Sequence, residues 1–85
     1  MDKIYVIVIE SCNDGVYTHD LFKCAYTDKE DAVAKVKQLF DVEKRQSWLC
    51  DYNEDEYHLE ECDYSIAVTT FDDNYLILNI EELML

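Results

Sequence analysis

The chain contains a single glycine and no proline, and the glycine stands in the tripeptide Asn13-Asp14-Gly15. Asn, Asp and Gly accept the positive φ angles of tight hairpin turns, which makes this tripeptide the strongest turn signal in the sequence. On either side of it lie stretches rich in β-branched and aromatic residues, 3–10 and 16–26. Such residues favour strands, so the sequence predicts an N-terminal β-hairpin. The apolar run 4–9 within the first stretch predicts that 3–10 is a strand covered on both faces.

The four cysteines show no metal or redox spacing. They lie at positions 12, 24, 50 and 62, with no Cys-x-x-Cys pair among them. In a hairpin centred on Asp14, Cys12 is expected opposite Val16 or Tyr17 and Cys24 opposite Ile4 or Tyr5. Two residues so placed are too far apart for a disulfide. The cysteines are therefore interpreted as small hydrophobic residues, and neither a metal site nor a cofactor is expected.

A helix is predicted over about 28–46. Thr27-Asp28-Lys29-Glu30 matches a capping box, and the acidic residues near the start of this segment suit the positive end of a helix dipole. Apolar residues then recur at spacings of three and four, as on one face of a helix. This face comprises Ala32, Val33, Val36, Leu39, Phe40 and the stem of Glu43.

The second half of the chain predicts another hairpin. Residues 63–71 are β-prone, 72–74 form a turn, and 75–80 return as a strand that 81–85 either extends or ends in a last turn. The stretch 48–61 leaves two alternatives open: a short acidic helix capped by Asn53, or a strand that begins near Glu56.

Together these elements predict a two-layer α+β domain spanning 1–85, in which an antiparallel sheet of about four strands packs against one main helix. An apolar fraction of 49% and an aromatic fraction of 13% argue against disorder. No apolar run reaches the ~20 residues of a membrane span, and 4–9 is too short for the core of a signal peptide. A cytoplasmic protein is expected.

Charge is distributed very unevenly along the chain. All seven Lys and Arg residues lie in the first 45 positions, whereas residues 46–85 carry eleven carboxylates and no Lys or Arg. The C-terminal part thus holds −11 of the net charge of −13. Such a field repels nucleic acid and anionic membranes and attracts basic protein surfaces. Ordinary surfaces intersperse both signs, so a protein partner with a basic surface is predicted.

Phosphate mimicry is the specific function that these carboxylates suggest. Carboxylates at i and i+2 of a strand lie ~6.6 Å apart, and those one helical turn apart lie about 6 Å apart, close to the spacing of successive phosphates. Tyr52 and Tyr57 alternate with the acids and suit an interface, whereas Tyr64 is expected to fill the core. The predicted partner-binding residues are Asp51, Tyr52, Glu54, Asp55, Glu56, Tyr57, Glu60, Glu61, Asp63, Asp72 and Asp73.

No catalytic constellation is recognisable, and an enzyme is not expected. His19 is interpreted as a surface residue of a strand, and His58 as a local neutraliser of nearby carboxylates. Negative neighbours are expected to disfavour the thiolates of Cys50 and Cys62. The segment from Asp51 begins like a calcium loop, but its sixth position is Glu instead of Gly and its twelfth is Cys instead of Glu.

In size, acidity, unpaired cysteines and hairpin–helix–hairpin pattern, the chain resembles the small acidic DNA mimics of phages and mobile elements, which include anti-CRISPR and anti-restriction proteins. The resemblance implies an inhibitor that occupies the DNA- or PAM-binding surface of a CRISPR effector nuclease in the host cytoplasm. The alternative is a small structural or regulatory module that self-associates, as a homodimer for example, through exposed edge strands such as 75–80. In that case the acidic half would serve solubility.

Overall fold

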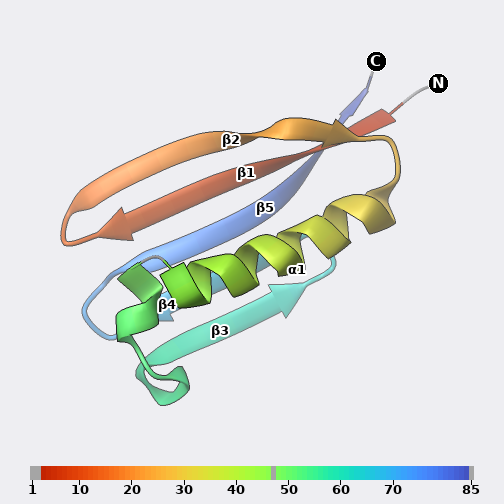
Figure 1. Cartoon of the computed structure of the whole chain (residues 1–85). Coiled ribbons are helices and arrows are strands. Elements are labelled where there is room, and N and C mark those ends of the chain that lie inside the picture. The colour runs from red at the N-terminus through yellow and green to blue at the C-terminus, as the bar shows by residue number, and fades with distance from the viewer. Residues whose placement is uncertain (1–2, 47, 85) are drawn as a thin grey trace.

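The computed structural model describes residues 3–46 and 48–84, which form an antiparallel five-stranded sheet with one long helix on one face (Figure 1). Along the chain the elements are β1 (Lys3–Asn13), β2 (Val16–Tyr26), α1 (Lys29–Gln46), the 3-10 turns η1 (Trp48–Asp51) and η2 (Glu54–Glu56), β3 (Tyr57–Cys62), β4 (Ser65–Thr70) and β5 (Tyr75–Met84). The strand order is β2-β1-β5-β4-β3. The predicted α+β class is confirmed.

The sheet has one strand more than the four expected. The ambiguous acidic stretch forms the short turn η2 and then β3, which pairs with β4 from Tyr57↔Thr70 to Cys62↔Ser65. Residues 81–84 extend β5, which lies between β1 and β4. The prediction that 75–80 is an exposed edge is therefore wrong, and the edges of the sheet are β2 and β3.

The first hairpin turns where the sequence predicts. Asp14 and Gly15 adopt φ angles of 52° and 82°, and Cys12 lies opposite Tyr17 as expected. The expected position of Cys24 is wrong, because the register shifts between Val6 and Val8 and brings Tyr26 opposite Tyr5.

Helix α1 begins one residue later than a cap at Thr27 would require. The Glu30 amide donates to Asp28 Oδ1 at 3.0 Å, so Asp28 caps the helix and the predicted Thr27 box is wrong. An ionised carboxylate is the stronger acceptor for the exposed amides at this positive end. The predicted apolar stripe is confirmed: Ala32, Val36 and Phe40 are buried.

The core lies between α1 and the helix-facing side of the sheet, where Ile7, Val68 and Leu78 are fully buried. The expectation that 3–10 is covered on both faces is wrong: within 3–46 and 48–84, no element packs on the other face. Val6 and Val8 on that side are nevertheless only 8% exposed, because neighbouring strands screen them.

Lys3 pairs with Met84, so both ends of the described chain lie together at one end of the sheet, as Figure 1 shows. Among the described residues, no helix combines the length and apolarity needed to cross a bilayer.

Candidate protein-binding surface

Three acidic segments meet at the end of the sheet farthest from the chain ends (Figure 1). They are the β1–β2 turn, the segment η1–η2 and the β4–β5 turn. Asn74 joins all three: its Oδ1 accepts from the Asp14 amide at 2.9 Å, and its Nδ2 donates to the Tyr52 hydroxyl at 3.0 Å. The Tyr52 hydroxyl in turn donates to Asp72 at 2.9 Å. This network fixes the segments relative to one another.

The network also holds a carboxylate in its charged form. The hydroxyls of Thr70 and then Tyr52 donate to Asp72, and these hydrogen bonds lower the pKa of that carboxyl below its ordinary value. Hydrogen bonding to Asp72 is also the main cause of the raised pKa of Tyr52. Asp72 is therefore ionised at neutral pH although Asp73 adjoins it.

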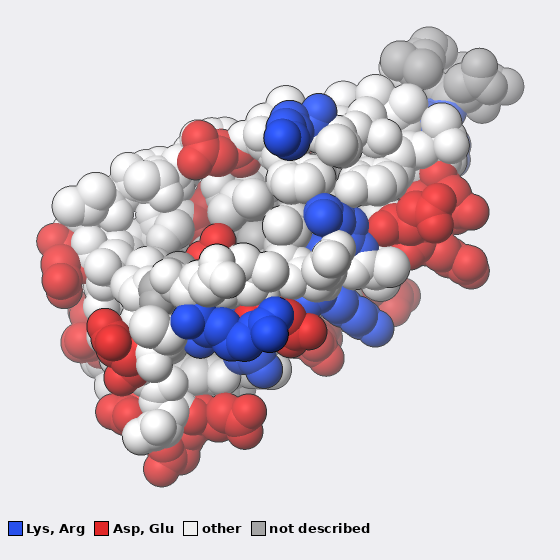
Figure 2. All heavy atoms as spheres, viewed as in Figure 1, with Lys and Arg blue, Asp and Glu red and all other residues white. Residues whose placement is uncertain are grey.

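We call this surface the acidic end; its carboxylates are all exposed. They belong to Asp14, Asp51, Glu54, Asp55, Glu56, Asp72 and Asp73. Figure 2 shows red side chains at this end and a second red group toward the chain ends, whereas the cations visible in the same view lie mainly over α1. The backbone of η2 is held by the Asn53 amide, which donates to Glu56 Oε1 at 2.9 Å.

Three of the predicted partner-binding residues lie apart from this surface. Glu60 and Glu61 are neighbours in β3 and point to opposite faces of the sheet, and Asp63 follows the other end of that strand. Since η2 spans three residues, η2 and β3 provide neither the strand nor the helix spacing of carboxylates that the sequence suggested. The carboxylates gather from separate turns instead.

The tyrosines divide differently from expectation. Tyr52 and Tyr57 are half-buried and pack against the core, and Tyr52 meets the Trp48 ring edge-on at 5.8 Å between centroids. Tyr64 was expected to be in the core but is 44% exposed, with Lys29 Nζ 3.7 Å from the centre of its ring. Tyr64 lies in the β3–β4 turn, beyond the reach of the core layer.

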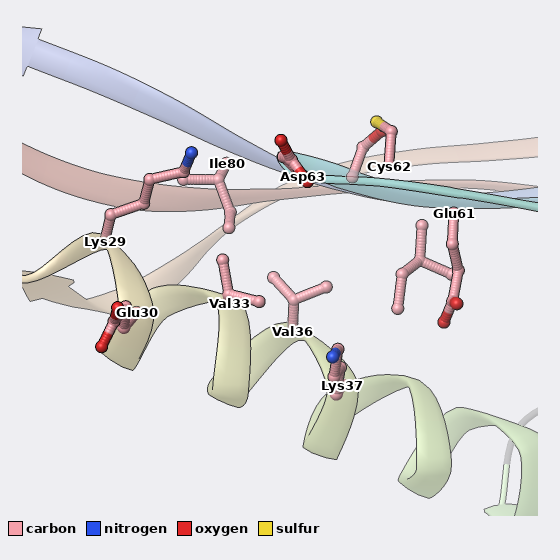
Figure 3. Close-up of a pocket in the computed structure, with 11 residues that line it drawn as sticks. Lys29, Glu30, Val33, Val36, Lys37, Glu61, Cys62, Asp63 and Ile80 are labelled. Atoms are coloured by element: carbon pink, nitrogen blue, oxygen red, sulfur yellow. The ribbon is translucent and has the colours of Figure 1, made fainter.

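A groove separates the first half of α1 from the β3–β4 hairpin (Figure 3). Its volume is about 620 Å³, and its walls include Val33, Val36 and Ile80. Figure 3 shows Glu61 pointing toward the helix and Cys62 pointing away from it. The groove has an apolar floor and a charged rim, which includes Lys29, Glu30, Lys37, Glu61 and Asp63.

The cysteines are more accessible than expected. Cys12 is half-buried and Cys24, Cys50 and Cys62 are exposed, all as free thiols. Negative neighbours were expected to disfavour the Cys62 thiolate, but the pKa of this thiol is lowered. The cause is hydrogen bonding to the Ser65 hydroxyl, 3.0 Å away, and to the backbone of Tyr64, which outweighs the charge of Asp63.

The two histidines each contact a glutamate. His58 Nε2 lies 3.3 Å from Glu60, and His19 Nε2 lies 3.7 Å from Glu10. Both are exposed. In the part of the chain that the structure describes, no three His, Cys, Asp or Glu side chains converge to hold a metal ion.

Two residues of the acidic end escaped the sequence analysis. Asp14 was interpreted only as a turn residue, and Asn74, which is 3% exposed, only as the last residue of a turn. An Asn that follows two Asp residues is a weak signal by itself. The contacts of Asn74 become visible only when the strand order brings the two turns together.

No family model, no curated protein and no solved structure matches this chain.

Proposed function

We propose that the protein is a non-enzymatic inhibitor that binds the basic, nucleic-acid-binding surface of another protein through its acidic end. The single observation that carries the proposal is the network through Asn74 and Tyr52, which holds three carboxylate-bearing segments at one end of the sheet. A surface whose charges are fixed before binding loses little conformational entropy when a partner docks.

The chemistry of such a partner follows from the charge. Grooves that bind nucleic acid present Lys and Arg to phosphates and release counterions when those phosphates arrive. Seven exposed carboxylates at the acidic end would be attracted to the same cations and would exclude the nucleic acid. The resemblance to anti-CRISPR proteins makes a CRISPR effector nuclease the leading candidate, with its PAM-reading surface as the place of contact.

The test uses the protein immobilised by its chain ends, so that the acidic end is free, and a lysate of its host. Retained proteins are eluted with rising salt and, in parallel, with duplex DNA or RNA. A partner of the proposed kind is released by moderate salt, because ionic contacts are screened, and by nucleic acid, because both ligands occupy one surface.

A matched pair of variants assigns the contact. Glu54→Gln, Asp55→Asn and Glu56→Gln together should abolish retention, because they remove three charges from η2 while the new side-chain carbonyl at position 56 still accepts from the Asn53 amide. Asp20→Asn, Asp31→Asn and Asp41→Asn remove three exposed charges from β2 and α1 and should leave retention unchanged. Equal retention by both triple variants, or a partner that nucleic acid does not displace, would contradict the proposal.

A further inference from the structure

The sheet face opposite α1 is an apolar surface that no helix of the described residues covers. Cross-strand pairs identify its members, because directly opposed residues point to the same side. Ile7 and Leu78 face the helix, so their neighbours in β1 and β5 face away from it. The apolar residues of this open face include Ile4, Val6, Val8, Leu21, Ala25 and Ile77, and the polar Asn79 lies opposite Val8 in β5.

The tyrosines nearest the acidic end confirm the assignment. Cys12 lies opposite Tyr17 in β2 and opposite Tyr75 in β5. The pKa of Tyr75 is raised, first by burial and then by the nearby Cys12, Tyr17 and Glu10. These four residues therefore share one face of the sheet.

The open face carries few of the chain's carboxylates. Each of its glutamates Glu10 and Glu60 has a histidine within reach, at 3.7 Å and 3.3 Å. Glu81, opposite Val6, is the third carboxylate of this face. A basic partner would be drawn to the acidic end, whereas two copies of a chain with net charge −13 repel each other least through a face where carboxylates are few.

The size of the face suits a stable interface. Three strands of ten or eleven residues and two of six, ~4.8 Å apart with a rise of ~3.3 Å per residue, present roughly 700 Å² on one side. A stable protein–protein interface takes about 800 Å² from each partner. A second copy would cover the exposed side chains Tyr17, Leu21 and Leu83, which are otherwise an aggregation hazard.

We propose that a second copy of this chain covers the open face, so that two sheets pack face to face with the helices outward. The arrangement gives the apolar residues 4–9 of β1 the second apolar layer that their sequence predicts. It leaves the acidic ends exposed in both copies and does not depend on the proposed function.

The test is the mass of the purified full chain by sedimentation equilibrium over the micromolar range, with three variants that share one chemical change. Leu21→Glu and Leu83→Glu place a charge on the open face at positions 65% and 43% exposed in one copy. Leu59→Glu places it on the helix side of edge strand β3, at a position 41% exposed. Wild type and Leu59→Glu should be dimers, and both open-face variants should dissociate at least about tenfold more readily, because a carboxylate is costly to bury.

Other outcomes overturn the proposal. If the wild type is a monomer at all concentrations, a second copy does not cover the open face. The same conclusion follows if the open face of a monomer is protected only when a different protein is added. Dissociation by Leu21→Glu but not by Leu83→Glu indicates edge-to-edge pairing of β2. Added salt should strengthen the dimer, because screening reduces repulsion between like-charged copies, whereas it weakens the binding proposed above.

Discussion

Thr70 anchors the β4–β5 turn of the acidic end. The Thr70 side chain is 4% exposed, and its hydroxyl donates to Asp72. The backbone amide of Asn74 donates to the same hydroxyl at 3.1 Å. A valine at position 70 would have nearly the same shape but could neither donate nor accept these hydrogen bonds. The turn that carries Asp72 and Asp73 would then lose its contacts to the Thr70 hydroxyl and keep those to Tyr52 and Asp14.

We expect Thr70→Val to lower the free energy of unfolding at pH 7 by about 1–3 kcal/mol, because buried polar groups lose their partners. The lowered pKa of Asp72 contributes stability above the ordinary pKa of about 3.9 that is lost as the pH falls through the folded value. The difference between variant and wild type should therefore shrink below about pH 4. Urea unfolding from neutral to acidic pH measures it. Thr69→Val, on the exposed neighbour, is the control, and an equal loss in both would contradict the role of Thr70.

Ser65 acts on Cys62 in a similar way. Because a lower pKa gives more thiolate at neutral pH, Cys62 should be alkylated faster in wild type than in Ser65→Ala, where its main hydrogen bond is absent. Peptide-resolved mass spectrometry after brief iodoacetamide treatment measures the rate at each cysteine. Cys24 and Cys50 are internal controls, and a rate at Cys62 that Ser65→Ala does not change would refute the effect.

At the level of single elements, the start of α1 gives the sharpest difference between expectation and structure. Thr27 and Asp28 are both good capping residues, and the sequence pattern favoured Thr27 because Glu30 stands three positions later. The structure assigns the cap to Asp28. Local pattern alone does not decide between adjacent candidates, because the approach of the chain from β2 determines which side chain reaches the free amides.

Asp28→Ala should therefore destabilise the protein by about 1 kcal/mol, the usual cost of losing an N-cap, and Thr27→Ala by much less. Urea denaturation of the two variants gives the comparison. A larger loss in Thr27→Ala would restore the capping box that the sequence suggested.

The elements with strong local signals were the ones that sequence could predict. The turn at Asp14-Gly15 and the apolar stripe of α1 depend on residues close together in the chain. The sequence left β3 ambiguous because Tyr57–Cys62 lacks a clear alternation of apolar and polar residues, and only one of its residues is half-buried in the structure. The segment becomes a strand through its pairing with β4. The register shift near Val6, which displaced Cys24, leaves no trace in the composition of either strand.

For the molecule as a whole, the unbalanced charge sets an energetic condition. A net charge of −13 on 85 residues opposes compaction, since the carboxylates repel one another more in the folded state than in the expanded one. The acidic end concentrates that repulsion. Six of its seven carboxylates could be named from sequence, but their gathering follows from the strand order, which determines that three turns share one end.

Salt should therefore stabilise the fold. As the Debye length falls from about 10 Å at 0.1 M to 3 Å at 1 M, self-repulsion is screened and Tm should rise, by roughly 4–8 °C for each kcal/mol gained. Differential scanning calorimetry at two protein concentrations separates this effect from self-association, which alone depends on concentration. A Tm that falls with sodium chloride would mean that attractive ion pairs outweigh the repulsion.

The pairing of Lys3 with Met84 has a practical consequence for experiments on this molecule. A tether, a fluorophore or a surface attached at either end of the chain is held on the side away from the acidic end (Figure 1). The same adjacency allows the two ends to be joined by a short linker and the chain to be reopened in another loop. Such a circular permutant would place a reporter inside the acidic end itself, between Asp72 and Asn74 for instance.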